Sequence, residues 1–224
     1  MTVKTERIYI FKGFERFWHW MQSLLIFIMA ITGFEIHGTY QLLGFERAIT
    51  VHEFSAWSLI VLWVFAIFWH LSTGEYKHYL PVKEGMWKQV MYYTRGIFTG
   101  EPHPFHASLR AKHNPLQRVA YLSLKVFMFP LIWISGLLYL FYNDWAVLGL
   151  EKLGLTLEMV AVVHVIGAFL ILLFIIAHLY LITTGETVLQ FTKAMITGWE
   201  EVPVETHAKE AKPSENSGER SAKE

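Results

Sequence analysis

Two histidines stand inside an apolar run that is long enough to cross a lipid bilayer. His164 and His178 lie in the stretch from Met159 to Tyr180, where Tyr180 is the only other side chain with a strong polar group. The fourteen residues between them would rise about 21 Å as α-helix and complete nearly four turns, so both imidazoles point to almost the same side. Ionisable groups in lipid are costly and normally face a bundle interior. The pair therefore predicts that something is bound between helices at two depths.

Three further histidines lie near the ends of other apolar segments, and depth pairs them with the first two. His52 stands at the start of the second segment, at the depth of His164. His19, near the start of the first segment, and His70, at the end of the second, both share the depth of His178. The sequence therefore indicates an outer pair, His52 with His164, and an inner pair in which either His19 or His70 joins His178. The other six of the eleven histidines are expected to be solvated residues of loops, helix ends or the tail: His37, His78, His103, His106, His113 and His207.

Two pairs of neutral imidazoles facing each other across a bundle suit two planar cofactors with axial ligands, which is what haem requires. Gly33, Gly136 and Gly167 are expected to give the macrocycles room. The chain has no cysteine, which excludes disulfides, thiolate-bound iron–sulfur clusters, zinc thiolate sites and covalent c-type haem. The alternatives are a transporter whose histidines bind a divalent metal ion, although no Asp or Glu lies in the interior of the apolar segments, and a purely structural anchor.

Four apolar segments predict an all-α integral membrane protein, a four-transmembrane-helix bundle that encloses the two haems. Hydrophobic residues make up 54% of the 224 residues and charged residues only 17%, which is too apolar for a soluble domain. Each segment is close to the roughly 20 residues that a spanning helix needs. The N-terminus lacks the pattern of a removable signal peptide. The predicted helices are 17–36, 54–71, 119–142 and 158–182, within a domain of residues 1–199 that a disordered tail, 200–224, follows.

Positive charge assigns the connecting loops to the two sides of the membrane. Of the 19 Lys and Arg residues, only Arg47 and Lys152 fall in the short loops after the first and third segments. Basic residues are retained in the cytoplasm, so the long loop 72–118 and both termini are predicted to be cytoplasmic. Residues at the opposite face are candidates for contact with a partner protein: Glu35, His37, Arg47, Glu53, Asp144 and Glu158.

Several motifs resemble the four-helix di-haem cytochrome b family over residues 10–198. They are Arg16-Phe-Trp-His19-Trp20, His52, Lys112-His-Asn114-Pro-Leu-Gln117-Arg118, and His164-x-x-Gly167 followed by His178-Leu-Tyr180. This family includes the γ subunit of respiratory formate dehydrogenase and the cytochrome b subunits of thiosulfate reductases and nickel–iron hydrogenases. The resemblance implies that His52 and His164 are the axial ligands of an outer haem b iron. It implies that His19, rather than His70, holds the inner haem b iron with His178.

The resemblance also implies a quinone site beside the inner haem. Asn114 and Gln117 are the expected contacts of a menaquinone or ubiquinone, and Lys112, His113 and Arg118 are their neighbours. An Asn/Gln turn at the cytoplasmic interface would offer hydrogen-bond partners for the quinone carbonyls and a proton route to water. The pair Asn114-Pro115 is equally typical of a helix start, with Asn114 as cap, and the two interpretations are compatible.

The function implied by this resemblance is that of a membrane-anchor electron-transfer subunit in a respiratory oxidoreductase complex of the bacterial inner membrane. Electrons would pass between an extracytoplasmic iron–sulfur or multihaem redox subunit, with its catalytic subunit, and the quinone pool. No residue of the chain is suited to substrate chemistry of its own, so no catalytic residue is expected. Membrane lipid is the remaining expected partner, and no nucleic acid is expected.

Overall fold

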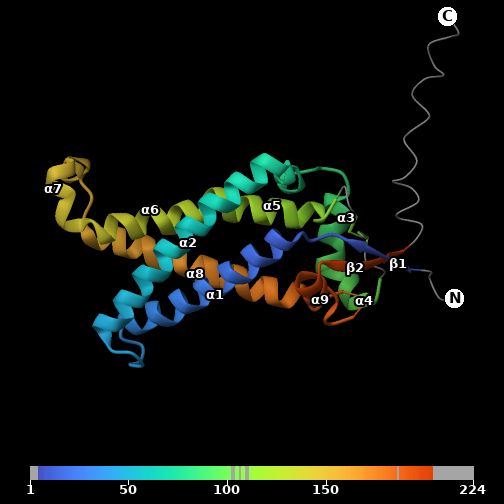
Figure 1. Ribbon diagram of the computed structural model, residues 1–224, viewed down its shortest axis with the longest axis horizontal. Helices are drawn as coiled ribbons and strands as arrows, with labels where there is room; N and C mark the ends of the chain where they lie inside the picture. Colours follow the sequence, from blue (N-terminus) through green and yellow to red (C-terminus); the bar gives the residue numbers. More distant parts are fainter. Residues whose placement is uncertain (1–4, 102–103, 106, 109–110, 186, 204–224) are drawn as a thin grey trace, which may run out of the picture.

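Four long helices run side by side in the computed structural model (Figure 1), which describes residues 5–101, 104–105, 107–108, 111–185 and 187–203. They are α1 (Gly13–Ile36), α2 (Phe45–Thr73), the continuous helix formed by α5 (Pro115–Ser123), η3 (Leu124–Met128) and α6 (Phe129–Leu140), and α8 (Leu157–Leu181). All four are long and apolar enough to cross a membrane. Large side chains such as Phe54, Phe68 and Phe127 are exposed on the bundle surface, as lipid-facing residues are. The predicted four-helix architecture is confirmed.

The second long helix begins at Phe45, well before its predicted start at residue 54. The Glu35 carboxylate accepts hydrogen bonds from the backbone N–H groups of Leu42, Leu43 and Gly44, at 2.7, 2.6 and 2.8 Å. Gly44 has a φ of 88°, which glycine adopts without strain, and the chain turns there into α2. Glu35 is only 4% exposed, so it organises this loop and is not available to a partner protein, contrary to the sequence-based expectation.

The long helices form two hairpins, α1 with α2 and α6 with α8. Side chains join the hairpins in a core of buried residues: Leu25, Leu59, Trp63, Leu124 and Phe129. The ring of Trp63 stands edge-on to that of Phe129, with centroids 4.5 Å apart, and its indole N–H donates to Gln22 Oε1 at 2.8 Å. Trp63 stands between His52 and His70 along α2, so this core separates the two histidine levels.

The third long helix contains a π-helical turn, Leu124–Met128, which ends two residues before Pro130. Proline has no backbone N–H, and a wider turn next to it accommodates the missing hydrogen bond. Lys125 lies in this turn with its ammonium 3.2 Å from the centre of the Tyr79 ring and 5.6 Å from that of Trp18. Among the described residues, no carboxylate forms an ion pair with it.

Short elements gather at the two ends of the bundle (Figure 1). One end, called here the sheet end, carries η1 (Glu75–Tyr79), the helical run α3 (Met86–Met91), η2 (Tyr92–Gly96) and α4 (Ile97–Thr99), α9 (Gln190–Thr197), and an antiparallel pair of strands, β1 (Thr5–Tyr9) and β2 (Trp199–Pro203). The other end, the loop end, carries residues 37–44, η4 (Tyr142–Asp144), α7 (Trp145–Leu148) and η5 (Leu150–Leu153).

The sheet end ties both ends of the described chain to the bundle. Thr5 pairs with Pro203 and Tyr9 with Trp199 in the two-stranded sheet. The Trp20 indole N–H donates to the Met195 carbonyl at 3.1 Å, which fixes α9 against α1. Residues 200–203, which hydropathy assigned to the tail, are therefore part of a strand because β1 supplies their backbone partners. The rest of the predicted disordered tail, 204–224, lies outside the described residues.

Candidate functional site

The four predicted haem ligands lie opposite one another in two pairs. The ring centroids of His52 and His164 are 6.4 Å apart, and those of His19 and His178 are 6.2 Å apart. A metal–imidazole bond of about 2 Å plus about 1 Å from nitrogen to ring centre puts two trans imidazoles about 6 Å apart. Each pair therefore has the separation that one metal ion between two imidazoles requires.

In the outer pair, a hydroxyl group contacts Nδ1 of each imidazole, which leaves Nε2 for a metal ion. Thr32 Oγ1 donates to the Ile28 carbonyl at 2.9 Å and lies 3.0 Å from His52 Nδ1. Because its single hydrogen is committed to that carbonyl, the hydroxyl accepts from Nδ1–H, which leaves the lone pair on Nε2.

The partner histidine is held in the same way from the other hairpin. Ser135 Oγ donates to the Leu131 carbonyl at 2.6 Å and lies 3.1 Å from His164 Nδ1. Both outer histidines are thus set in the tautomer that presents Nε2 to a metal.

Two of the three glycines make room for these histidines. A Cβ on Gly33 would lie 3.5 Å from His52 Cε1, and one on Gly136 only 3.1 Å from His164 Cε1. A Cβ on Gly167 would instead meet Ile132 at 3.2 Å, so Gly167 allows α8 to approach α6. Among the protein atoms nearest to each glycine, the imidazole edges lie beside Gly33 and Gly136, and the expectation that all three glycines give haem room stays a prediction.

Gly136→Ala is expected to weaken haem binding at the outer level, because the new methyl group would push His164 from its position. Loss of a group that orients a metal ligand typically costs 10- to 100-fold in affinity, so we expect a decrease of about tenfold. Gly33→Ala is the matched control, since its methyl group would sit at ordinary contact distance from His52. Haem titration of the apoprotein measures both variants, and equal behaviour would contradict this reading of the two glycines.

In the inner pair, the imidazoles face a cavity of about 440 Å³ at the sheet end. His19 Nδ1 is buried and has no hydrogen-bond partner among the described residues, and the ring of His178 stacks on Phe174 with an interplanar angle of 8°. Apolar walls and two opposed imidazoles fit a b-type haem at this level.

His70, the other candidate for the inner ligand, lies to one side of this pair. Its Nδ1 is 2.6 Å from the Ala66 carbonyl and its Nε2 is 3.4 Å from the Tyr79 hydroxyl. The ring stands edge-on to Trp18 and Trp69. Both nitrogens of His70 thus have protein partners, which gives this histidine a structural explanation.

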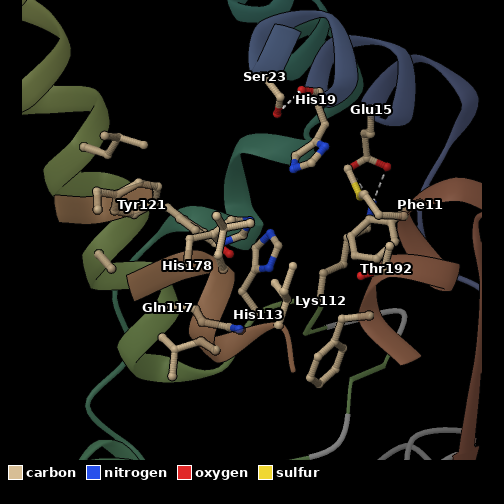
Figure 2. Close-up of a pocket in the computed structure, with 18 of the residues that line it drawn as sticks. Phe11, Glu15, His19, Ser23, Lys112, His113, Gln117, Tyr121, His178 and Thr192 are labelled. Atoms are coloured by element: carbon tan, nitrogen blue, oxygen red, sulfur yellow. Dashed lines mark hydrogen bonds and ion pairs between the residues drawn. The ribbon is translucent and has the colours of Figure 1, made fainter. Parts of the chain in front are cut away.

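Four of the five residues that the resemblance placed at the quinone site line the cavity, namely Lys112, His113, Asn114 and Gln117 (Figure 2). Arg118 does not line it and instead donates to the His113 and Leu80 carbonyls. Asn114 caps α5: its Oδ1 accepts from the backbone N–H of Gln117 at 2.8 Å, and its own N–H donates to Gln117 Oε1 at 3.0 Å. Asn114 Nδ2 donates to the Tyr93 hydroxyl at 3.1 Å. The helix-start interpretation is confirmed. Asn114 therefore positions the turn, whereas the amide nitrogen of Gln117, which makes no hydrogen bond to the described residues, can serve a ligand.

His113 is a cavity residue that reasoning from the sequence placed among solvated loop histidines. Its ring packs edge-on against Tyr121 and tilted against Tyr79, with centroids 5.0 and 5.2 Å away. Burial, reinforced by the positive charges of Lys125, Lys112 and Arg118 and by nearby His78, lowers the pKa of His113 to about 3. The imidazole is thus neutral at physiological pH and can donate or accept a hydrogen bond inside the cavity.

A cluster of charged groups lies between this cavity and the surface. Lys112 Nζ is 2.8 and 2.9 Å from the two Glu15 oxygens and 2.7 Å from Glu75 Oε2. Lys12 Nζ is 2.6 Å from Glu75 Oε1, and His78 Nε2 is 3.4 Å from Glu75 Oε2. Burial disfavours the charged form of Glu75, but hydrogen bonds from Lys112 and Lys12 outweigh it and lower its pKa below the ordinary value. The cluster is charge-balanced and joins α1, η1 and the segment before α5.

Comparisons with known proteins show the family of the chain. Residues 10–198 match the family described as prokaryotic cytochrome b561. A relative from Escherichia coli K12, named "Putative cytochrome YdhU", is 32% identical over 202 residues, which cover 87% of this chain and 75% of the relative. No solved structure matches the chain. Four apolar helices, two facing pairs of histidines and these two matches lead to one conclusion: the chain belongs to the prokaryotic cytochrome b561 family.

Proposed function

We propose that this membrane cytochrome b holds two haems b and carries electrons between an extracytoplasmic redox subunit and the quinone pool. Membership of the family makes it an electron-transfer protein of the inner membrane that binds haem b. The proposal adds the number of haems, their ligands and the two partners. Bound haem supplies one-electron chemistry, because its iron alternates between the ferric and ferrous states.

The observation that carries the proposal is the presence of two facing histidine pairs at opposite levels of one bundle. His52 and His164 would ligate the outer haem iron, and His19 and His178 the inner one. Helix α8 supplies one ligand to each level, and about 21 Å of helix rise separates the two. Electrons would therefore cross most of the membrane within this chain.

The cavity at the sheet end is where the proposal places the quinone. Gln117 would donate a hydrogen bond from its amide nitrogen to one carbonyl oxygen, and neutral His113 would bond to the other. Asn114 would act indirectly by holding the turn. Since the same cavity contains His19 and His178, a quinone bound there would lie beside the inner haem.

The distribution of charge supports an orientation with the sheet end in the cytoplasm. In the part of the chain that the structure describes, Arg47 and Lys152 are the only Lys or Arg residues in the short connections of the loop end, and the other basic residues belong to segments that begin or end at the sheet end. The positive-inside rule then puts both termini in the cytoplasm and the outer haem near the extracytoplasmic partner.

A histidine-lined transporter for divalent metal ions would need more ligands than the structure offers. Among the described residues, no group of three or more His, Cys, Asp or Glu side chains could hold a metal ion. Two imidazoles at each level are the number that a haem iron takes from protein, because the macrocycle fills the other four positions.

The test is the optical and redox behaviour of the purified, haem-loaded chain. The reduced-minus-oxidised spectrum is expected to show b-type haem at about two equivalents per chain, and a water-soluble naphthoquinol is expected to reduce it. A chain with one equivalent of haem would overturn the two-haem proposal. Haem that dithionite reduces but naphthoquinol does not would overturn the quinone site.

A further inference from the structure

We infer that the cluster of Glu15, Lys112 and Glu75 conducts protons between the quinone cavity and His78 at the surface of the sheet end. The inference rests on the proposed quinone site. It adds Glu75 and His78, which do not line the cavity and would touch neither the haems nor the quinone.

Close contacts between charged groups span the distance from the cavity to the surface. Glu15 and Lys112 line the cavity, whereas Glu75 and His78 lie behind them. Lys112 Nζ bridges Glu15 and Glu75 at 2.7 to 2.9 Å, and Glu75 Oε2 leads on to His78 Nε2 at 3.4 Å. Lys112 and Glu15 are hydrogen-bonded, whereas the two contacts of Glu75 Oε2 are ion pairs of 2.7 and 3.4 Å, so the path requires the Glu75 carboxylate to turn toward each partner in succession.

Exposure of the side chains rises from Lys112 outward. The side chain of Lys112 is 5% exposed, that of Glu75 9%, that of His78 16% and that of Lys12, which also binds Glu75, 51%. Two buried carboxylates and a buried ammonium at the wall of an apolar cavity are costly to desolvate, and a structural clamp alone could be made of apolar residues. A role in proton transfer would explain why these buried residues are ionisable.

The chemistry balances in either direction. When a quinol is oxidised, two electrons pass one at a time to ferric iron, and two protons must leave the cavity. For each proton, Lys112 gives one N–H proton to Glu75 and takes one from the cavity side, directly or through Glu15, so its charge is restored. Glu75 then passes its proton to His78, which releases it to water at the surface. Quinone reduction runs the same steps backward.

The experiment compares Glu75→Gln with Glu75→Asp and with Glu84→Gln, an exposed carboxylate outside the cluster. All variants are the full chain loaded with haem, and dithionite-reduced spectra first establish that both haems are bound. Stopped-flow reduction by naphthoquinol is then measured in H₂O and D₂O. Loss of a proton-transfer group should slow the Glu75→Gln reaction about tenfold or more, increase its solvent isotope effect, and allow acetate to restore part of the rate. Glu75→Asp and Glu84→Gln should react nearly as the unchanged chain does.

The outcomes separate the two proposals. If the unchanged chain is not reduced by naphthoquinol, the quinone site fails and the proton path fails with it. If the unchanged chain is reduced and Glu75→Gln reacts at the same rate, only the proton path is overturned. A slower Glu75→Gln without an isotope effect or acetate rescue would make the cluster a structural clamp and would also overturn the path. Should Glu75→Gln fail to bind haem, His78→Gln, which alters only the outer step, decides by the same measurements.

Discussion

His164→Ala is expected to remove the outer haem and leave the inner one, and His178→Ala is expected to do the reverse. Each residue is one half of a pair whose partner lies on another helix, and a single remaining imidazole should not hold a b haem against loss. Haem content should therefore fall to about half in either variant. Haem quantification and a redox titration, which resolves the two haems by potential, measure this loss.

Naphthoquinol distinguishes which haem remains. In His164→Ala the haem that is left lies beside the cavity, so naphthoquinol should still reduce it at a rate close to that of the unchanged chain. In His178→Ala the haem that is left is about 21 Å of helix away, so dithionite should reduce it and naphthoquinol should not. His37→Ala, at an exposed position of the loop end, is the control and should retain both haems. Loss of both haems from either variant would mean that the levels are not independent.

The spacing of residues on one helix made the main features of the site predictable. Helical periodicity alone puts His164 and His178 on one face, and depth alone matches them with His52 and with His19 or His70. The helix cap at Asn114 was predictable from the sequence because Asn114, Pro115 and Gln117 form a short local pattern that is typical of a helix start. These inferences depend on contacts within one helix or on hydropathy.

The groups that orient the outer histidines come from other helices, and periodicity does not pair residues across a bundle. One signal was nevertheless present in the sequence. Thr32-Gly33 in the first segment and Ser135-Gly136 in the third are the same combination, a hydroxyl residue followed by glycine inside an apolar helix. In the structure each hydroxyl binds a histidine Nδ1 and each glycine receives the imidazole edge.

The long loop was less predictable because its polar residues look solvated in the sequence. His113 was expected to be solvated, yet the loop folds back over the sheet end and encloses it, whereas His78 is only partly covered. Lys112 similarly reaches Glu15, which precedes it by nearly a hundred positions. Such contacts depend on how η1 and the segment before α5 pack against α1, which no local pattern specifies. His103, His106 and His207 lie outside the described residues.

His19 and His70 compete for the inner haem on sequence grounds, and ligand replacement should decide between them. His19 faces His178 with centroids 6.2 Å apart and has an unpartnered Nδ1, whereas both nitrogens of His70 have protein partners. His19→Ala should therefore lose the inner haem, and His70→Ala should keep two haems, with a loss of stability from its buried hydrogen bonds of about 1 to 3 kcal/mol.

Methionine at the same two positions gives a sharper answer, because it can itself ligate iron. Met/His ligation raises the reduction potential of a haem relative to two histidines. His19→Met should thus raise the midpoint potential of the haem that naphthoquinol reduces, while His70→Met should leave both potentials nearly unchanged. A raised potential in His70→Met, with none in His19→Met, would transfer the inner ligand to α2. That result would mean that α2 supplies one ligand to each haem, His52 to the outer and His70 to the inner. His19 would then be only a residue of the cavity wall.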